Sequence, residues 1–282
     1  MHHVLQKSYF SKKKVLGFLK RLAANEEITS GNPKRFWKQA TILNIQRGGS
    51  SQKEMLQTFD PILKEQYGYG VGDCEKESET AIYIDDVVFS GGHVRGDLIN
   101  WIVERAPKSV QIHIIALALY EGGRYYAQEK ILEAATNAKK SVKLRWWRIH
   151  ELEDRKISIN ASDVLRPTRI PDDKATIRYA EQLKAEGYPP VLRKPGSVGP
   201  AKIFSSEENR DLLEQQFLIK GVEIREKCPY LNKHQHPLGN TVLRMLGFGA
   251  TAVTFRNCAN NCPLAIWAGD PWIPLFPRKI SQ

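Results

Sequence analysis

The sequence has no long hydrophobic run, which excludes a membrane-spanning helix. No apolar stretch in its 282 residues approaches the roughly 20 residues that a transmembrane helix needs. A secretory signal is also missing, because Lys20 and Arg21 interrupt the apolar residues near the N-terminus. Those residues fit an amphipathic helix capped by Ser11. We therefore expect a protein without membrane association.

Cysteine is scarce, and the common metal-site spacings are missing. The chain has four cysteines, and without a secretory signal this number is typical of a protein of the reducing cytoplasm. The candidate zinc ligands have C-x5-H-x-H and C-x3-C spacings, which are looser than those of zinc ribbons and fingers. We expect no zinc site from these candidates, which are Cys228, His234, His236, Cys258 and Cys262.

Two common nucleotide-binding motifs are absent as well. Residues 196–202 have the wrong spacing for a Walker-type phosphate loop, and they contain Pro200. The glycines of 68–72 follow an expected helix rather than a strand, so they are not a dinucleotide-binding fingerprint. Any phosphate site must therefore be sought in other glycine turns.

Positive charge is in excess. The 42 Lys and Arg residues outnumber the 31 Asp and Glu residues, which gives a formal net charge of +11. Three interpretations stay open: a nucleic-acid surface, steering of a polyanionic small substrate, or a solvated partner-binding face with tryptophans packed inward. The residues concerned include Lys12, Lys13, Lys14, Lys139, Lys140, Lys143, Arg145 and Arg148, with Trp146 and Trp147 among them.

Strands and helices alternate between residues 34 and 148. Apolar strands separated by amphipathic helices indicate an α/β fold whose parallel sheet is covered by helices on both faces. Ligands of such sheets bind beyond the carboxyl ends of the strands. The expected strands are 41–45, 81–84, 110–119 and 142–149, and the expected helices begin near residue 52 and cover 94–106 and 125–138.

The chain divides into three expected segments. Residues 1–33 contain the N-terminal amphipathic helix, residues 34–150 form the α/β core, and residues 151–282 form a loop-rich α+β extension. In the extension, Ser205 and Glu208 have the spacing of a capping box. The elements expected there are helices over 174–186 and 205–220 and short strands over 250–255 and 264–267.

The most informative segment is the run from Ala81 to His93. An apolar strand ends in Asp85 and Asp86, and the turn Ser90-Gly91-Gly92 then leads into a helix. Backbone N–H groups of a glycine turn at a helix N-terminus suit a phosphate. Ionised aspartates accept hydrogen bonds and suit hydroxyl groups or a metal ion. A ribose 5-phosphate group satisfies both halves. The alternative is an ordinary βα loop in which the aspartates cap the turn and helix.

A second glycine turn supports this interpretation. The expected strand 41–45 runs into Arg47, Gly48, Gly49 and Ser50, and a helix follows near residue 52. Arginine binds phosphate oxygens with two parallel hydrogen bonds. A solvated arginine in a plain βα connection is the alternative.

These two segments resemble class I phosphoribosyltransferases. The run IYIDDVVFSGGH is similar to the loop of that family that binds phosphoribosyl pyrophosphate (PRPP). By this resemblance Asp85 and Asp86 contact the ribose hydroxyls, and the turn of Ser90, Gly91, Gly92 and His93 holds the 5′-phosphate. Arg47, Gly48, Gly49 and Ser50 contact the pyrophosphate, and Mg²⁺ arrives with the ligand. Phe89 and His93 replace threonines of the commonest motif, and little sequence is left for a catalytic lid.

The C-terminal stretch, including HPLGNTVLRMLGFGATAVTFRNCANNCPLAIW, extends the resemblance. Together with the two loops it resembles the phosphoribosyltransferase-like proteins of bacterial conflict systems, which accompany anti-phage modules including some retrons. The resemblance implies a hood that contacts the acceptor. His236, Arg256 and Asn257, with Asn260 and Asn261, are the candidates for this role. DNA or a defence-complex protein is then a plausible partner.

We therefore expect an effector of anti-phage defence that binds PRPP or a nucleotide and acts at the anomeric carbon of ribose 5-phosphate. Asp85, Asp86 and Arg47 are the expected catalytic residues, with His93 and His236 as candidate bases by residue type. The alternative is an inactive nucleotide sensor, or a module that binds nucleic acid or a partner protein, on the same fold. The acceptor, the trigger and the oligomeric state do not follow from the sequence.

Overall fold

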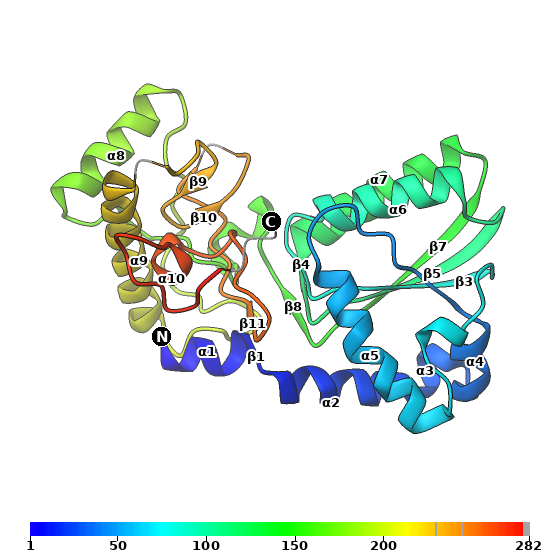
Figure 1. Ribbon diagram of the computed structural model, residues 1–282. Coiled ribbons are helices and arrows are strands. Elements are labelled where there is room, and N and C mark those ends of the chain that lie inside the picture. The colour runs from blue at the N-terminus through cyan, green and yellow to red at the C-terminus, as the bar shows by residue number, and fades with distance from the viewer. Residues whose placement is uncertain (229, 244, 279–282) are drawn as a thin grey trace. The chain divides into compact units, whose positions relative to one another are not determined.

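The strands expected between residues 34 and 150 form a parallel sheet in the computed structural model, which describes residues 1–228, 230–243 and 245–278 (Figure 1). Adjacent strands pair in the order β2-β3-β5-β7, and every pairing is parallel. The expected α/β class is therefore confirmed. The strands are β2 (Thr41–Ile42), β3 (Thr80–Ile84), β5 (Ser109–Ile115) and β7 (Ser141–Trp147).

Three of these strands break at the same level and continue in a second sheet. A link of two residues follows each break, and the chain then enters one strand of the order β4-β6-β8. The continuous strands expected over 110–119 and 142–149 were therefore wrong at this point. The link after β3 is Asp85-Asp86, the acidic pair expected to contact a ribose. The second-sheet strands are β4 (Val87–Val88), β6 (Ala118–Tyr120) and β8 (His150–Leu152).

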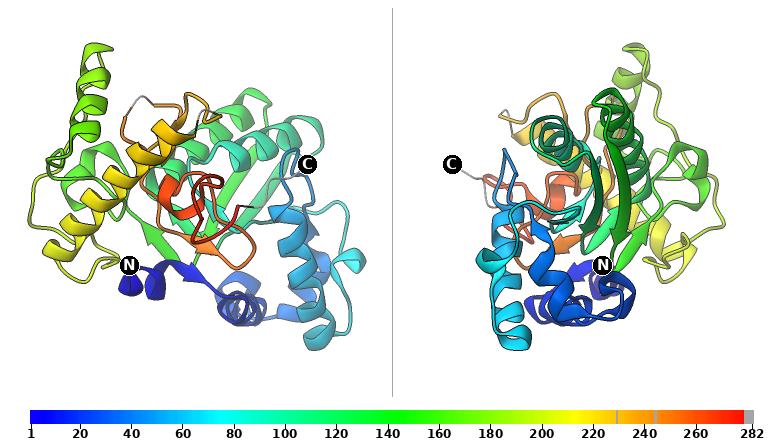
Figure 2. Two further views of the ribbon diagram at one scale, coloured as in Figure 1. Left: turned by 60° about the vertical axis from the view of Figure 1, so that its left-hand side comes forward. Right: turned by 90° about the vertical axis from the view of Figure 1, so that its right-hand side faces the viewer.

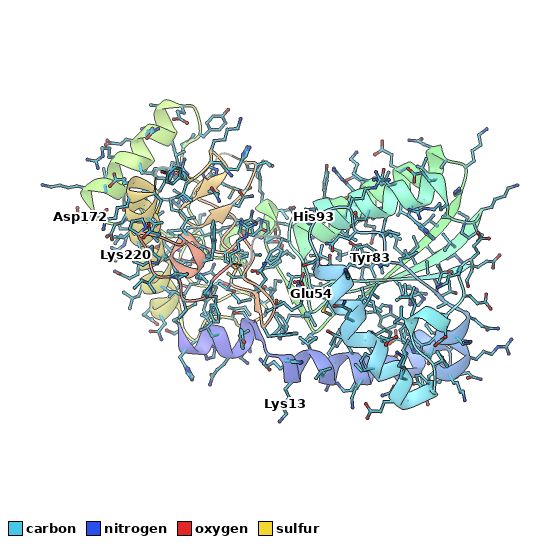
Figure 3. The ribbon with its side chains drawn as sticks, in the orientation of Figure 1. Lys13, Glu54, Tyr83, His93, Asp172 and Lys220 are labelled. Atoms are coloured by element: carbon cyan, nitrogen blue, oxygen red, sulfur yellow. The ribbon has the colours of Figure 1, made fainter. Side chains whose placement is uncertain are left out.

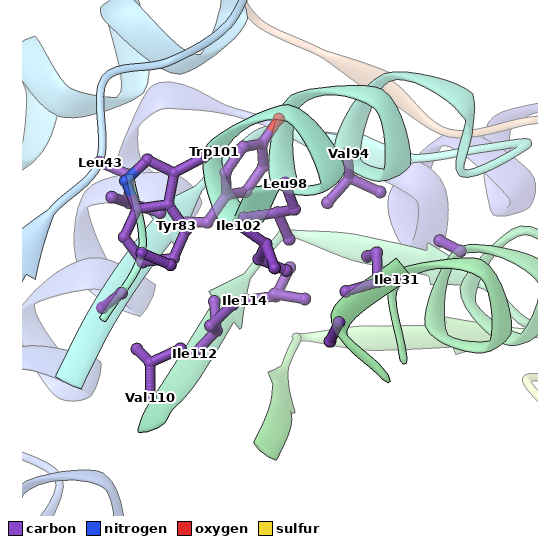
Figure 4. Close-up of a cluster of buried hydrophobic side chains, with 14 of the residues drawn as sticks. Leu43, Tyr83, Val94, Leu98, Trp101, Ile102, Val110, Ile112, Ile114 and Ile131 are labelled. Carbon is purple, nitrogen blue, oxygen red and sulfur yellow. The ribbon is translucent and has the colours of Figure 1, made fainter. Parts of the chain in front are cut away.

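Helices cover both faces of the main sheet. Side chains alternate along β5, so Ile112 and Ile114 face one side and His113 faces the other. The isoleucines belong to the core under α6 (Gly92–Glu104) and α7 (Glu121–Asn137), which Figure 4 shows in close-up.

The opposite face packs on α4 (Pro33–Gln39) and α5 (Ser51–Tyr67). The ring of Phe36 meets that of His113 at 5.5 Å, and Trp37 meets Phe59 at 5.0 Å between centroids. α2 (Lys12–Ala23) is capped by Ser11 as expected, and α3 (Glu26–Thr29) leads to α4. A short 3-10 helix (Val71–Asp73) follows α5. The helices of both faces bury the strands that carry the two glycine turns.

The chain forms two compact units, residues 11–151 and residues 1–10 with 152–278. This division differs from the three expected segments, because residues 11–33 fold with the α/β core and residues 1–10 fold with the C-terminal extension. The first ten residues do so because β1 (Tyr9–Phe10), which follows α1 (His2–Ser8), pairs in parallel with β11 (Val253–Thr254).

The second unit is built around the helix α9 (Glu207–Lys227), which contacts α8 (Lys174–Ala185) and α10 (Leu264–Trp267) (Figure 2). The strand expected over 264–267 was wrong, since this apolar run is too short for its pattern to separate strand from helix. The cap of α9 is Ser206 rather than Ser205, and its hydroxyl accepts from the N–H of Asn209 at 3.2 Å. Other elements are a 3-10 segment (Lys156–Ala161) and the hairpin of β9 (Gln235–His236) and β10 (Gly239–Asn240).

A buried charge network ties the loops of this unit to α9. The Glu214 carboxylate accepts from Arg210 Nε at 2.8 Å and from Arg193 Nη2 at 2.9 Å, and all three side chains are fully buried. Arg210 also donates to the carbonyls of Ser197 and Val164. Because each charge has a partner, the network orders loops that would otherwise lack regular structure.

None of the helices within the described residues is long and apolar enough to cross a bilayer.

Candidate phosphoribosyl site

The acidic pair lies at the break between the two sheets. β3 is buried along residues 81–84, and the backbone of the pair continues the pairing: Asp85 N–H donates to the Ile115 carbonyl at 2.9 Å, and the Asp86 carbonyl accepts from Leu117 at 2.8 Å. Asp85 is buried and Asp86 is half-buried. The sheet break thus places a half-exposed carboxylate directly after a rigid strand.

Each carboxylate also accepts a hydrogen bond from the next backbone N–H. Asp85 Oδ1 accepts from Asp86 at 2.8 Å, and Asp86 Oδ1 accepts from Val87 at 2.7 Å. This is part of what the capping alternative expected. One oxygen of each carboxylate is engaged in this way.

The turn after the pair leads into α6 through a left-handed glycine. Gly91 is the N-cap of α6 with φ 73°, a conformation that favours glycine because other residues would place Cβ against the backbone. Ser90 and His93 are exposed, and His93 lies in the first turn of α6 (Figure 3). The turn therefore presents the N-terminus of a 13-residue helix, which is a suitable place for an anion.

A residue not anticipated from the sequence supports this turn. A Cβ atom on Gly123, in the first turn of α7, would lie 1.8 Å from the Phe89 carbonyl oxygen, and one on Gly91 would lie 2.1 Å from the Gly123 carbonyl oxygen. The two backbones touch because both residues lack a side chain. The signal was the Gly122-Gly123 pair directly after an apolar strand, which repeats the pattern of the other two loops.

The second glycine loop is held by a pair of glutamines. Gln52 Oε1 accepts from the N–H groups of Ile45 and Gln46 at 2.6 and 2.9 Å, and Gln46 Oε1 accepts from Gln52 N–H at 3.0 Å. These bonds fix both ends of the loop that contains Gly48 and Gly49. Its left-handed residue is Gly49, with φ 85°. The loop is therefore preorganised, although β2 is shorter than the expected strand 41–45.

The Arg47 side chain lies at the surface in an ion pair. Its Nη2 is 3.3 Å from Glu104 Oε1, with both side chains more than half exposed. An exposed pair of this kind contributes little stability, typically less than about 1 kcal/mol. Exchange of Glu104 for a phosphate group would cost correspondingly little.

Asp97 links the two loops and was also missed. Its Oδ2 accepts from the Tyr83 hydroxyl at 2.9 Å, and its Oδ1 accepts from the Arg47 N–H at 3.2 Å. Burial strongly raises the pKa of the Tyr83 hydroxyl, which keeps it a donor. Figure 4 shows the Tyr83 hydroxyl directed toward α6. The signal was an aspartate beside the apolar face of α6, which needs a buried partner.

The expected hood residues differ in burial and in their hydrogen-bond partners. His236 is buried in β9 with its Nδ1 3.3 Å from the Tyr179 hydroxyl. Arg256 is buried in the turn after β11, where the Asn257 N–H donates to Thr254 Oγ1 at 3.2 Å. Asn261 donates to the Asn240 carbonyl at 3.1 Å. Their contact with an acceptor stays a prediction.

The three cysteines among the candidate zinc ligands, Cys228, Cys258 and Cys262, are free and buried. Cys262 Sγ lies 3.5 Å from the Ala252 carbonyl, and Cys228 Sγ lies 3.7 Å from that of Asp270. Within the described ranges no group of three or more His, Cys, Asp or Glu residues could hold a metal ion.

The basic and aromatic residues of β7 divide between its two faces. Trp146 donates to Gln128 at 2.9 Å on the α7 side, and Trp147 donates to His113 Nδ1 at 3.0 Å on the other side. Lys143 and Arg145 are exposed and alternate with the partly buried positions. Both tryptophans are therefore packed in part, and one face of β7 carries two lysine or arginine side chains.

The geometry gives unit 11–151 acceptors and donors in the order that a sugar phosphate requires. Carboxylates follow β3, and a helix N-terminus follows them within one turn. The arginine-bearing loop leaves the adjacent parallel strand β2 at the same edge of the sheet. Asp97 holds the two loops together.

The comparisons with known proteins identify the family of the chain. A family model described as PRTase-CE matches residues 1–278, which covers nearly the whole chain. None of the curated proteins and none of the solved structures matches it. The resemblance to phosphoribosyltransferases that the two loops indicated is thereby confirmed at the level of the family. The chain belongs to the PRTase-CE family and is a phosphoribosyltransferase-like protein.

Proposed function

We propose that residues 11–151 bind PRPP or a nucleotide through its ribose 5-phosphate and that the protein acts at the anomeric carbon. The observation that carries this proposal is the sheet break at Asp85-Asp86, followed directly by the left-handed Gly91 at the start of α6. The half-buried Asp86 accepts hydrogen bonds from the ribose hydroxyls. The backbone N–H groups near Ser90 to His93 donate to the 5′-phosphate.

Arg47 and the backbone of Gly48, Gly49 and Ser50 take the pyrophosphate. Mg²⁺ fits this site because carboxylate, phosphate and water oxygens are its preferred ligands. Since the described residues contain no cluster of three metal ligands, the ligand's phosphates and water would supply most of its coordination. When bound, the ion would help to neutralise charge on the pyrophosphate. Arg47 contributes the same effect from the protein.

The reaction is a substitution at the anomeric carbon. The bond between this carbon and its leaving group breaks, and both electrons go to the pyrophosphate or base that departs. An acceptor nucleophile or water then gives an electron pair to the carbon and loses a proton. The chain's own contribution is to hold the ribose and both phosphate groups in place.

Isothermal titration with PRPP and Mg²⁺ tests the proposal. Asp86→Asn should weaken binding about 10- to 100-fold, because a hydrogen bond to a charged group contributes about 1.5–3 kcal/mol. Asp172→Asn is the matched control, since Asp172 is exposed and lies in the other unit (Figure 3). Equal PRPP affinity in the two variants, or no binding by the wild type, would refute the site.

Product analysis separates an enzyme from a sensor. Release of pyrophosphate or of a free base from the bound ligand would show turnover at the anomeric carbon. Tight binding without either product would favour the alternative, a nucleotide sensor on the same fold.

A defence role in the cytoplasm of a bacterium is also part of the proposal, and the resemblance to conflict-system proteins supports it. Cells that express the chain should form fewer phage plaques than cells that express Asp86→Asn. Equal plaque counts across a panel of phages would contradict the role.

A second candidate function is nucleic-acid binding at β7. Lys143, Arg145 and Trp147 share one face of this edge strand, and basic side chains beside an aromatic ring suit single strands. Fluorescence anisotropy with a labelled DNA oligonucleotide tests it. The double variant Lys143→Ala/Arg145→Ala should reduce the salt slope by about 1–2 relative to the exposed control Lys53→Ala. An unchanged slope would exclude this surface.

A further inference from the structure

A pocket of about 530 Å³ lies within the unit of residues 1–10 and 152–278. It is formed by α8, α9 and the segment 233–242, which Figure 1 shows close together. None of the lining residues comes from residues 11–151. Its volume falls in the range of about 300–1,000 Å³ that is typical of small-molecule sites. Its lining includes Tyr179, Leu183, Val222, Arg225, Lys233 and His236.

The floor of the pocket consists of an apolar surface beside one pair of polar side chains. Leu183 and Val222 are buried members of the hydrophobic cluster of this unit. Beside them the Tyr179 hydroxyl lies 3.3 Å from His236 Nδ1. Burial raises the pKa of Tyr179 to about 12, so its hydroxyl keeps its proton, and the tautomer of His236 decides which of the two groups donates. The floor therefore suits a planar ring with a polar edge.

The rim carries more positive than negative charge. Arg178 is balanced by Glu226 at 2.8 Å, and the Glu186 carboxylate accepts from Gln182 at 3.0 Å. Arg225 donates to main-chain carbonyls, including the Asn232 carbonyl at 3.4 Å. Carbonyl groups are neutral, so Arg225 keeps its charge. Lys233 takes part in no ion pair among the described residues. The lining thus has three cations, Arg178, Arg225 and Lys233, against two carboxylates, Glu186 and Glu226, so one positive charge is in excess and can attract an anion.

We propose that this pocket binds a small phosphate-bearing ring compound of the nucleoside monophosphate class. The ring lies against Leu183 and Val222, with its polar edge toward Tyr179 and His236. The phosphate lies at the rim, where Lys233 and Arg225 meet it. This site is additional to the proposed PRPP site, because every residue that forms it belongs to the other unit.

Titration calorimetry with adenosine 5′-monophosphate (AMP), adenosine and inorganic phosphate tests this proposal. The Asp86→Asn protein is used so that binding at the PRPP site is weakened. AMP should bind this protein, and adenosine should bind at least about tenfold more weakly because it lacks the phosphate. Lys233→Ala should weaken AMP binding about tenfold. Tyr179→Phe should weaken both AMP and adenosine.

Lys184→Ala is the control, because Lys184 is exposed on the same helix as Tyr179 and does not line the pocket. Lys233 is exposed, so its replacement leaves the fold intact, and the circular dichroism spectrum verifies this. The proposal is overturned if AMP does not bind the Asp86→Asn protein, if adenosine binds as tightly as AMP, or if Lys233→Ala matches Lys184→Ala. These outcomes can be distinguished from a failure of the PRPP site. That site is tested separately, by comparing PRPP binding of the wild type with that of Asp86→Asn.

Discussion

The Tyr83 hydroxyl donates to the buried carboxylate of Asp97 at 2.9 Å, and this bond connects the strand before the acidic pair to the helix after it. The other Asp97 oxygen accepts from the backbone of Arg47, so one carboxylate also holds the second loop. Three segments that are distant in sequence are thereby fixed around one side chain. The candidate site depends on this contact although neither residue is expected to touch the ligand.

Tyr83→Phe removes the hydroxyl and leaves one oxygen of the buried carboxylate without that donor. We expect the free energy of unfolding to fall by about 1–3 kcal/mol, as measured by urea titration. Tyr126→Phe is the matched control, since the Tyr126 hydroxyl meets Arg95 at an exposed position and its loss should change stability by less than about 0.5 kcal/mol. Equal effects of the two changes would mean that the Tyr83–Asp97 bond is not important.

Gly123→Ala should disrupt the turn of the acidic-pair loop. The added methyl group would lie 1.8 Å from the Phe89 carbonyl oxygen, so the two backbones must separate. We expect a loss of about 1–3 kcal/mol in thermal or urea unfolding. Gly96→Ala in α6 is the control: its Cβ would meet nothing within 4 Å, and the change should stabilise the helix by about 0.5–1 kcal/mol. A neutral Gly123→Ala variant would show that the contact can relax.

His113 should make stability depend on pH. Burial and the nearby Arg145 lower the pKa of His113 from 6.5 to about 4, and its Nδ1 accepts from the Trp147 indole N–H at 3.0 Å. Between these values the unfolded chain binds a proton that the folded chain does not. Stability from this group is therefore present above about pH 6.5 and falls as the pH drops toward 4, by up to about 3 kcal/mol.

Urea unfolding at a series of pH values checks this dependence. Relative to the wild type, His113→Gln should flatten the curve between pH 6.5 and 4, whereas His93→Gln, at an exposed position, should not. Trp147 fluorescence gives a second signal, since protonation of Nδ1 ends the indole hydrogen bond. Parallel curves for all three proteins would assign the acid sensitivity to other groups.

Glu214→Gln should destabilise the unit that contains α9. It removes the charge that neutralises the buried Arg193 and Arg210, and a broken buried pair costs about 3–5 kcal/mol. Glu223→Gln removes a carboxylate that pairs with Lys220 and Lys227 at the surface of the same helix, so its cost should be less than about 1 kcal/mol. Limited proteolysis and thermal unfolding measure both. Similar melting temperatures would contradict a stabilising role for the network.

The local patterns of this chain were sufficient for its α/β class and for its family. Continuous apolar runs located the strands of the sheet, and a period-3.6 apolar pattern located most helices. The order of strand, acidic pair, glycine turn and helix indicated the phosphoribosyltransferase resemblance. These features are local, because burial of one face and the backbone freedom of glycine act within a few residues.

Long-range contacts decided the rest. Three features depend on backbones and side chains from distant segments. The strands β3, β5 and β7 break at one level, Gly123 lies against Gly91, and Asp97 joins Tyr83 to Arg47. The pairing of Tyr9–Phe10 with Val253–Thr254 is of the same kind. No local pattern specifies which distant partner forms the hydrogen bond of a buried polar group. The sequence alone therefore determined the elements and the motif, and the tertiary structure determined which contacts hold them in place.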